Sequence, residues 1–161
     1  MDASTGVELL YDGPVRRMIA AANHHDLDAM VAEFSDDYEN ITPIHPARNF
    51  TGRAQVRRNW ENLFAGVPNL HLTVYNAETA PDGTVWMEWG NSGIRRDGVP
   101  VEMAGVSIFT VRADRIAGVH FYLEPVDHGN GDINAAVRET TTAPAASAES
   151  AARPVAGGEM R

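Results

Sequence analysis

The chain has 161 residues, no cysteine, and 22 acidic against 13 basic residues, which gives a formal net charge of −9. The missing cysteine excludes disulfides, thiol nucleophiles and thiolate metal sites. All the basic residues are arginine, so Schiff-base chemistry on lysine is excluded as well. The acidic balance argues against a nucleic-acid partner, because phosphate contacts need a basic face.

The length is that of a single domain with a sizeable core. The first residues lack the basic start and apolar run of a signal peptide. No stretch approaches the run of about 18 apolar residues that a membrane helix needs. We therefore expect a cytoplasmic protein without a membrane partner, acting on small molecules or other proteins.

Residues 1–11 have no clear period and are expected to form a flexible lead. Asp12-Gly13-Pro14 then predicts the start of a helix, with proline in its first turn. Its apolar side chains follow at helical spacing: Val15, Met18, Ile19 and Ala22. Asp26 is expected to cap a second helix that ends at residues 35–37 and whose apolar stripe is Leu27, Met30, Val31 and Phe34.

A short strand is predicted over residues 38–42, and prolines make residues 43–49 a loop. Thr51-Gly52 predicts the start of a third helix, which ends at Gly66. The apolar stripe of this helix consists of Val56, Trp60, Leu63 and Phe64. Three predicted helices therefore precede the rest of the chain.

After residue 70 the apolar period changes from helical to strand-like. Strands are predicted over residues 70–76, 84–94, 99–111 and 115–124. The tight turns between them predict an antiparallel meander, with bends or bulges at Gly90, Gly93 and Gly105. Ile133 begins a possible last helical turn, and residues 140–161 are too poor in large apolar side chains to order, so a disordered tail is expected.

Three segments carry a resemblance to a known family. Phe50-Thr51-Gly52-Arg53 resembles the family's entry into the third helix, and residues 68–72 (PNLHL) resemble the start of its sheet. Residues 115–125 (RIAGVHFYLEP) resemble its last strand. Together they are similar to the SnoaL-like branch of the nuclear transport factor 2-like (NTF2-like) superfamily, over residues 12–139. The resemblance implies an α+β fold, a cone in which a curved antiparallel sheet wraps three N-terminal helices and leaves an apolar pocket.

Members of this superfamily include ketosteroid isomerase, polyketide cyclases and limonene epoxide hydrolase, so the fold alone does not settle the chemistry. Tyr38-Glu39-Asn40 resembles the Tyr-x-Asn that holds the attacking water in the epoxide hydrolases. Where those enzymes carry Arg-x-Asp and a second Asp, this chain has Trp89, Asn91 and Phe121. Since an amide cannot act as a proton-transferring base, epoxide hydrolysis by that mechanism is disfavoured.

Strand alternation predicts which side chains line the pocket. The expected ligand-binding residues are Met87, Trp89, Asn91, Met103, Ser107 and Phe121. Tyr38 and Asn40 join Asn91 and Ser107 as the polar points of an otherwise apolar and aromatic wall. Such a pocket suits a flat, hydrophobic, oxygen-bearing ligand such as a polyketide, sterol or terpenoid.

The candidate bases are His120, Glu88 and Asp37, in that order of preference. Regular alternation places His120 and Glu88 on the outer face of the sheet, in a polar surface or a dimer contact. A bulge would reverse the register and bring one of them inward. Asp37 either belongs to a solvated turn or lies beside Tyr38. The histidines have no metal-binding spacing, and neither a metal nor a cofactor is expected.

Two hypotheses follow. In the first, the protein catalyses a cofactor-free proton transfer (cyclisation, isomerisation or dehydration), with Tyr38 and Asn40 polarising an oxygen of the substrate. In the second, the domain only binds a hydrophobic ligand or serves as a dimerisation module. A homodimer is expected in either case, because the outer face of the sheet exposes apolar residues and because family members pair there.

Overall fold

The computed structural model describes residues 5–142, which divide into two units, residues 5–126 and residues 127–142. Each unit is considered by itself. The first unit contains the helices η1 (Val7–Leu9), α1 (Pro14–Asn23), α2 (Leu27–Ala32), η2 (Pro46–Arg48) and α3 (Arg53–Gly66). Its strands are β1 (Phe34–Ile41), β2 (Phe50–Thr51), β3 (His71–Thr79), β4 (Val85–Ile94), β5 (Pro100–Arg112), β6 (Arg115–Phe121) and β7 (Glu124–Pro125).

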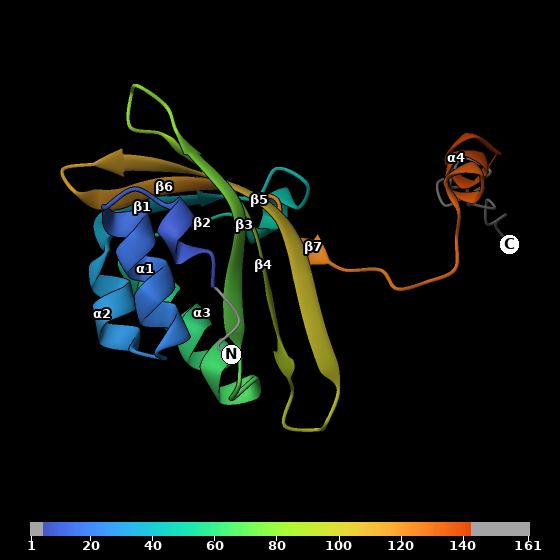
Figure 1. Cartoon of the computed structure of the whole chain (residues 1–161), viewed down its shortest axis with the longest axis horizontal. Helices are drawn as coiled ribbons and strands as arrows, with labels where there is room; N and C mark the ends of the chain where they lie inside the picture. Colours follow the sequence, from blue (N-terminus) through green and yellow to red (C-terminus); the bar gives the residue numbers. More distant parts are fainter. Residues whose placement is uncertain (1–4, 143–161) are drawn as a thin grey trace, which may run out of the picture. The chain divides into compact units, whose positions relative to one another are not determined.

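The strands form one sheet in the order β2-β1-β6-β5-β4-β3, and β7 pairs with β5. Strands β3 to β6 are a continuous antiparallel meander, as the turns predicted. Strand β1 pairs with β6 in parallel, so the first strand of the chain lies beside its last long strand. In Figure 1 the sheet curves, and α1, α2 and α3 lie together on one side of it. The α+β architecture is therefore the predicted one.

Helices α1 and α3 occur where their patterns placed them. Proline occupies the first turn of α1, and this helix buries the apolar residues of its predicted stripe together with Pro14. Helix α3 begins after Gly52 and ends at Gly66. These two helices supply the layer that covers the inner face of the sheet.

Helix α2 ends earlier than predicted. The carboxylate of Asp26 accepts a hydrogen bond from the backbone N–H of Ala29 at 3.0 Å, so the predicted cap is confirmed. The helix stops at Ala32, and Phe34 is already the first residue of β1, paired with Ile116 of β6. The prediction was wrong here because a buried Phe34 fits the helical period and the strand equally well, and pairing with β6 decides between them.

The predicted last strand is interrupted. Strand β6 ends at Phe121, and β7 resumes at Glu124, further along β5 and in the same register. The break faces Gly105, where a Cβ atom would lie 2.3 Å from the carbonyl oxygen of Tyr122. Only glycine leaves room for this close approach of two backbones. The pairing of β5 with β4 continues through Gly105 without a bulge.

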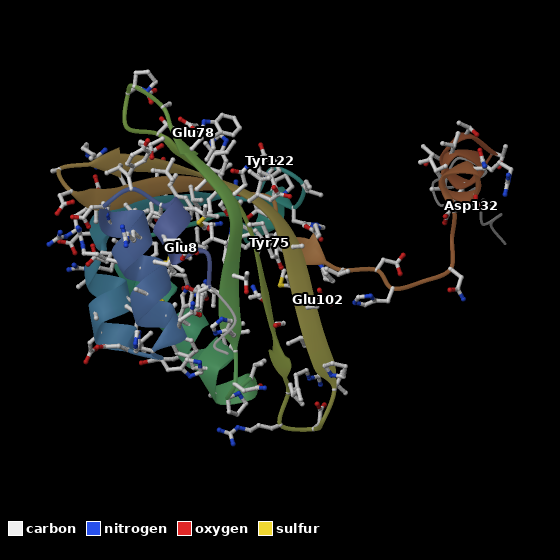
Figure 2. All side chains as sticks on the ribbon, viewed as in Figure 1. Glu8, Tyr75, Glu78, Glu102, Tyr122 and Asp132 are labelled. Carbon is white, nitrogen blue, oxygen red and sulfur yellow. The ribbon has the colours of Figure 1, made fainter. Side chains whose placement is uncertain are left out.

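The outer face of the sheet carries aromatic side chains. Residue Tyr75 lies at a bulge in β3 and is 54% exposed. Its ring crosses Gly90 of β4, where a Cβ atom would meet the Tyr75 hydroxyl at 2.8 Å. Figure 2 labels Tyr75 and Glu78 on this strand. Gly90 therefore lets an aromatic ring lie flat on β4, without a bulge in β4 itself.

The described part of the expected N-terminal lead is structured. Residues 7–9 form η1, Leu10 is buried, and the backbone N–H of Val74 donates to the carbonyl of Thr5 at 2.9 Å. This short segment has no apolar period and is ordered by its hydrogen bond to β3. Sequence periodicity alone does not predict such a contact.

In the second unit, α4 runs over Ile133–Thr142 and therefore continues past the expected start of the tail at residue 140. The carboxylate of Asp132 caps it by accepting from the N–H of Ala135 at 2.8 Å. The rest of the tail, from residue 143, lies outside the described residues. Within residues 5–142, no helix combines the length and the apolar character needed to cross a membrane.

Candidate functional site

A cavity of about 310 Å³ lies between α3 and the inner face of the sheet. Strands β1, β4, β5 and β6 supply one wall, α1 and α3 the other, and the loop that contains η2 forms the edge. The volume falls in the range of small-molecule sites. The lining consists of Met18, Phe34, Tyr38, Asn40, Thr42, Arg48, Phe50, Val56, Asn59, Trp60, Leu63, Trp89, Asn91, Met103, Phe109, Val119, Phe121 and Leu123.

Polar side chains on β1 and directly after it form a chain of hydrogen bonds along one side of this cavity. The hydroxyl of Tyr38 donates to Oδ1 of Asn40 at 3.2 Å, and Nδ2 of Asn40 donates to the hydroxyl of Thr42 at 3.0 Å. The backbone N–H of Thr42 donates in turn to Oδ1 of Asn49 at 2.7 Å. Since these groups alternate along one strand, they all reach the same face, and each buried polar atom has a partner.

Burial raises the pKa of the Tyr38 hydroxyl well above its ordinary value, because the charged phenolate would lose its hydration. The ring packs edge-on against Phe34, with centroids 4.9 Å apart, and tilted against Phe50 at 5.9 Å. Tyr38 therefore stays neutral at physiological pH. In this state it can give or accept a hydrogen bond, and it cannot serve as a base.

Six of the predicted residues meet in this cavity: Tyr38, Asn40, Trp89, Asn91, Met103 and Phe121. Two predicted ligand-binding residues do not reach it, since Met87 and Ser107 are fully buried behind the wall. The hydroxyl of Ser107 accepts a hydrogen bond from the indole Nε1 of Trp89 at 3.0 Å. Ser107 therefore fixes the orientation of a lining residue, and its assignment as a ligand-binding residue is corrected accordingly.

The candidate bases on the sheet point away from the cavity. His120 is exposed and lies between Val119 and Phe121, which both line the cavity from the opposite face. Glu88 is likewise exposed and is flanked by the buried Met87 and Trp89. Pairing of β4 with β5 is continuous over the whole of β4, so no bulge reverses the register there. His120 and Glu88 therefore both lie on the outer face of the sheet, as regular alternation predicted.

Asp37 also lies outside the lining. Its carboxylate is exposed and forms an ion pair with Arg112 at 2.8 Å. The neighbouring Ser35 hydroxyl and the Arg112 guanidinium hold the pKa of Asp37 below its ordinary value, which weakens it as a base. Among the described lining residues there is no carboxylate and no imidazole, so we no longer assign a base to Asp37, Glu88 or His120.

Sequence reasoning missed several lining residues. Asn59 lies on α3 three residues after Val56, so the helical period could have placed it on the inner face. Phe50 and Arg48 come from the irregular segment between β1 and α3, where no period applies. Arg48 is the charged residue among the described lining residues.

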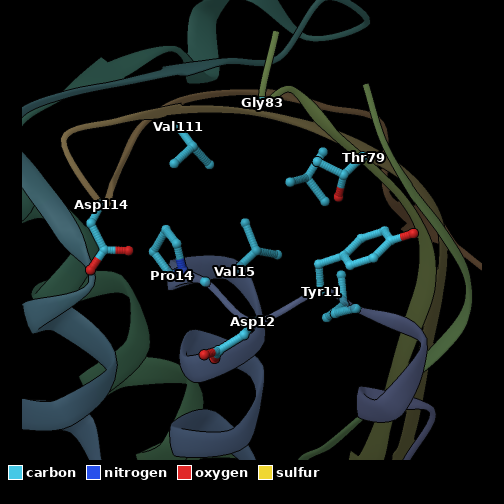
Figure 3. A pocket seen from close by; sticks show the side chains of 11 residues that line it. Tyr11, Asp12, Pro14, Val15, Thr79, Gly83, Val111 and Asp114 are labelled. Carbon is cyan, nitrogen blue, oxygen red and sulfur yellow. The ribbon is translucent and has the colours of Figure 1, made fainter. Parts of the chain in front are cut away.

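Two further hollows lie elsewhere on the first unit. One of about 330 Å³ lies beside the start of α1, and Figure 3 shows Tyr11, Asp12 and Asp114 around it. Tyr11 is 72% exposed, so a ligand there would stay in contact with solvent. The other, of about 650 Å³, contains Arg53 and Arg57, which form ion pairs with Asp36 and Asp28. Neither is lined by the predicted polar residues Tyr38, Asn40 and Asn91, which meet in the cavity under α3.

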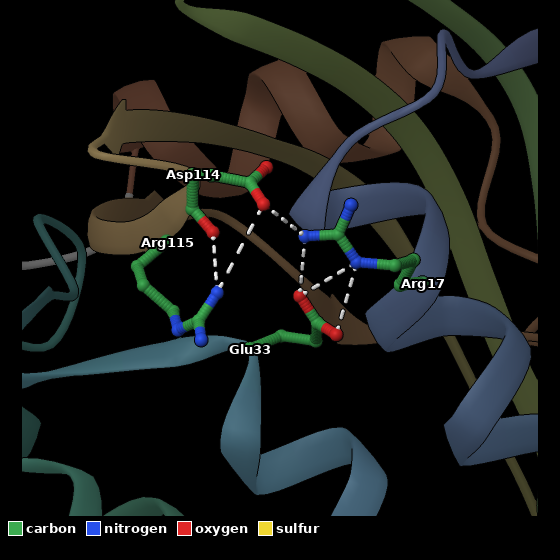
Figure 4. A network of polar contacts seen from close by, with 4 residues as sticks. All are labelled: Arg17, Glu33, Asp114 and Arg115. Carbon is green, nitrogen blue, oxygen red and sulfur yellow. Dashed lines mark hydrogen bonds and ion pairs between the residues drawn. The ribbon is translucent and has the colours of Figure 1, made fainter.

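The carboxylate of Asp114 is occupied within the protein. Arg17 of α1 donates to it at 3.0 Å and also donates to both carboxylate oxygens of Glu33, to Oε1 at 3.0 Å and to Oε2 at 2.8 Å (Figure 4). These charged hydrogen bonds raise the pKa of Arg17, chiefly through Glu33. The network joins α1 to the turn before β6 and is structural. Within residues 5–142 no group of three or more metal-ligating side chains comes together.

Comparison with known proteins identifies the family. A family model for the SnoaL-like domain matches residues 15–119, which is more than half of the 161 residues. The chain therefore belongs to the SnoaL-like family, as the sequence resemblance predicted. No curated protein matches the chain with significance.

Solved structures share the fold. A candidate isomerase from Bacillus subtilis has a TM-score of 0.61 at 18% identity, over 69% of this chain and 84% of that protein. A candidate polyketide cyclase from Sinorhizobium meliloti has a TM-score of 0.57 at 20% identity, over 73% and 98%. A protein with a ketosteroid isomerase-like fold from Catenulispora acidiphila, solved with trimethylamine, scores 0.58 at 22% identity, over 70% and 87%. The NTF2-like fold is therefore shown.

Proposed function

We propose that this protein binds a small, apolar, oxygen-bearing molecule in the cavity under α3. One observation carries the proposal: aromatic and aliphatic walls surround a connected strip of hydrogen-bonding groups, from Tyr38 through Asn40 to Thr42. Apolar walls supply affinity, and the strip orients a carbonyl or hydroxyl oxygen. The amide of Asn40 donates to Thr42, which leaves its second N–H and the Tyr38 lone pairs as contacts for a ligand.

Cofactor-free isomerisation or cyclisation is the second candidate. It is favoured by the names of two structural relatives, the candidate isomerase and the candidate polyketide cyclase. The second N–H of the Asn40 amide can polarise a carbonyl, and the neutral Tyr38 hydroxyl can do so when it turns from Asn40 to the ligand. Binding ranks first because the described lining has no side chain that can accept a proton at neutral pH.

A fluorescence titration with Prodan tests the binding proposal. Prodan is a neutral naphthalene with one ketone, so it matches the apolar body and the single oxygen acceptor. We expect saturable binding with a Kd on the order of micromolar and a blue-shifted emission from the enclosed probe.

A matched pair of variants locates the bound probe. Asn91→Tyr places a bulky ring in the cavity wall, whereas Ser92→Tyr places the same ring on the opposite face of β4. The first should weaken Prodan binding by about tenfold or more, and the second should change it less than about twofold. No saturable binding by the wild type, or equal binding by both variants, would contradict the proposal.

A further inference from the structure

Arg48 differs from the other arginines of the first unit. Within residues 5–126, each of the others donates a hydrogen bond or forms an ion pair with a carboxylate, a carbonyl or an amide oxygen. Among the residues that the structure describes, Arg48 has no such partner, although its side chain lines the cavity under α3. A guanidinium has five N–H donors in a fixed fork, so its donors are free for a ligand.

The loop that carries Arg48 is fixed on both sides of the residue. On one side, Oδ1 of Asn49 accepts from the backbone N–H of Thr42 at 2.7 Å. On the other, Nε2 of His45 lies 2.9 Å from Oε1 of Glu124, beside the lining residue Leu123. The backbone N–H of Arg48 itself donates to the carbonyl of His45 at 2.9 Å. Arg48 is therefore presented to the cavity from a braced turn, η2, rather than from a loop without contacts.

Arg48 also continues the polar strip of the cavity. The strip passes from Tyr38 through Asn40 to Thr42, and the Thr42 backbone is bound to Asn49, the neighbour of Arg48. The inner end of the strip is neutral and buried, whereas Arg48 is exposed. With no carboxylate among the described lining residues, nothing in the wall neutralises the guanidinium, even though the whole chain has a net charge of −9.

We infer that the ligand is an organic anion: an apolar body that fills the cavity and one carboxylate-type group that pairs with Arg48 at its edge. This inference rests on the proposed binding function and specifies the chemical class of the ligand. A guanidinium binds such a group through two parallel charge-assisted hydrogen bonds, which a neutral oxygen cannot match. The volume of about 310 Å³ suits a body of two or three rings.

Two probes that differ only in charge test the inference. N-phenyl-1-naphthylamine is neutral, and 8-anilino-1-naphthalenesulfonate is the same molecule with an added sulfonate. We expect the wild type to bind both, and to bind the sulfonate about fivefold or more tightly at low salt. Arg48→Gln should remove this preference while changing the affinity for the neutral probe less than about twofold. Arg48→Lys should retain part of it.

The control is Arg95→Gln, which makes the same change of net charge at the β4–β5 hairpin, away from the lining residues. It should leave the preference of the wild type intact. If Arg48→Gln kept the preference for the sulfonate, or lost affinity for both probes equally, the inference would be overturned and the binding function would still stand. Failure of the wild type to bind either probe would instead contradict the binding function itself.

Discussion

Tyr38 and Trp89 show how single residues define this site. Each is an aromatic side chain with one polar atom, and each has that atom tied to a neighbour, Asn40 for Tyr38 and Ser107 for Trp89. Their rings supply apolar wall while the hydrogen bonds fix their orientation, so the cavity has a defined shape before any ligand arrives. Substitution of Tyr38 and of Ser107 tests these contributions.

Tyr38→Phe should change the alkaline stability of the protein. Because burial raises the pKa of Tyr38 in the folded state, the unfolded chain releases this proton first as the pH rises. The wild type should therefore lose about 0.8 kcal/mol of unfolding free energy between pH 8 and pH 10.5 through this group, which titrates near 10 when unfolded. Urea unfolding at both pH values should show a smaller decline in the variant.

The same variant should also lose about 1 kcal/mol at pH 8, because Oδ1 of Asn40 loses its donor. Tyr11→Phe is the control, since this exposed tyrosine has no buried hydroxyl. An alkaline decline of the same size in wild type and Tyr38→Phe would refute the assignment to Tyr38.

Ser107→Ala should destabilise the protein by about 2 kcal/mol, since it leaves the buried indole N–H of Trp89 without an acceptor. Chemical unfolding followed by tryptophan fluorescence measures the loss. Ser92→Ala on the neighbouring strand is exposed and should have no comparable effect. Equal stability of the two variants would mean that the Trp89–Ser107 bond contributes little.

The elements of the fold differ in how far the sequence predicts them. Helices α1 and α3 and the meander from β3 to β6 have clear periods and clear turn residues, and they occur where expected. The beginning of β1 was assigned to a helix, because pairing with the distant β6 overrides an ambiguous local pattern. The division of the last strand into β6 and β7 depends on a close approach at Gly105, of which alternation gives no sign.

Gly105→Ala tests the role of this close approach. The added methyl group would collide with the backbone of Tyr122 and Leu123, which has no room to move within the sheet. We expect a loss of about 2 kcal/mol in unfolding free energy, measured by urea or thermal unfolding. Gly66→Ala is the matched control, because a Cβ atom at the end of α3 meets nothing within 4 Å. A fully stable Gly105→Ala variant would show that the two backbones can pass here without glycine.

At the scale of the whole molecule, the sheet separates two surfaces of different chemistry. Alternation along β4, β5 and β6 correctly assigned Trp89, Met103 and Phe121 to one face, because register follows from the tight turns. The same reasoning could not find Arg48, which an irregular loop brings to the cavity. It also could not decide whether His120 faced the cavity or the outside, since a single bulge would have reversed the answer.

The outer face supports a last prediction, that the protein pairs through it as a homodimer. Trp86 is 50% exposed on this face, next to Ile108 on β5, and Tyr75 is exposed on β3. Aromatic surface of this kind is stabilised when a partner covers it. Light scattering should give the mass of a dimer for the wild type, and Trp86→Glu should shift it toward the monomer because two added charges would be buried together.

Ile44→Glu is the control for this shift, since it places the same charge at an exposed apolar residue in the loop after β1. It should leave the mass unchanged. Probe binding to the monomeric Trp86→Glu variant then separates the two surfaces, because every described lining residue of the cavity comes from the inner face, the helices or the loop of Arg48. A monomeric wild type would contradict dimerisation, and loss of probe binding in Trp86→Glu would contradict the independence of the cavity from the outer face.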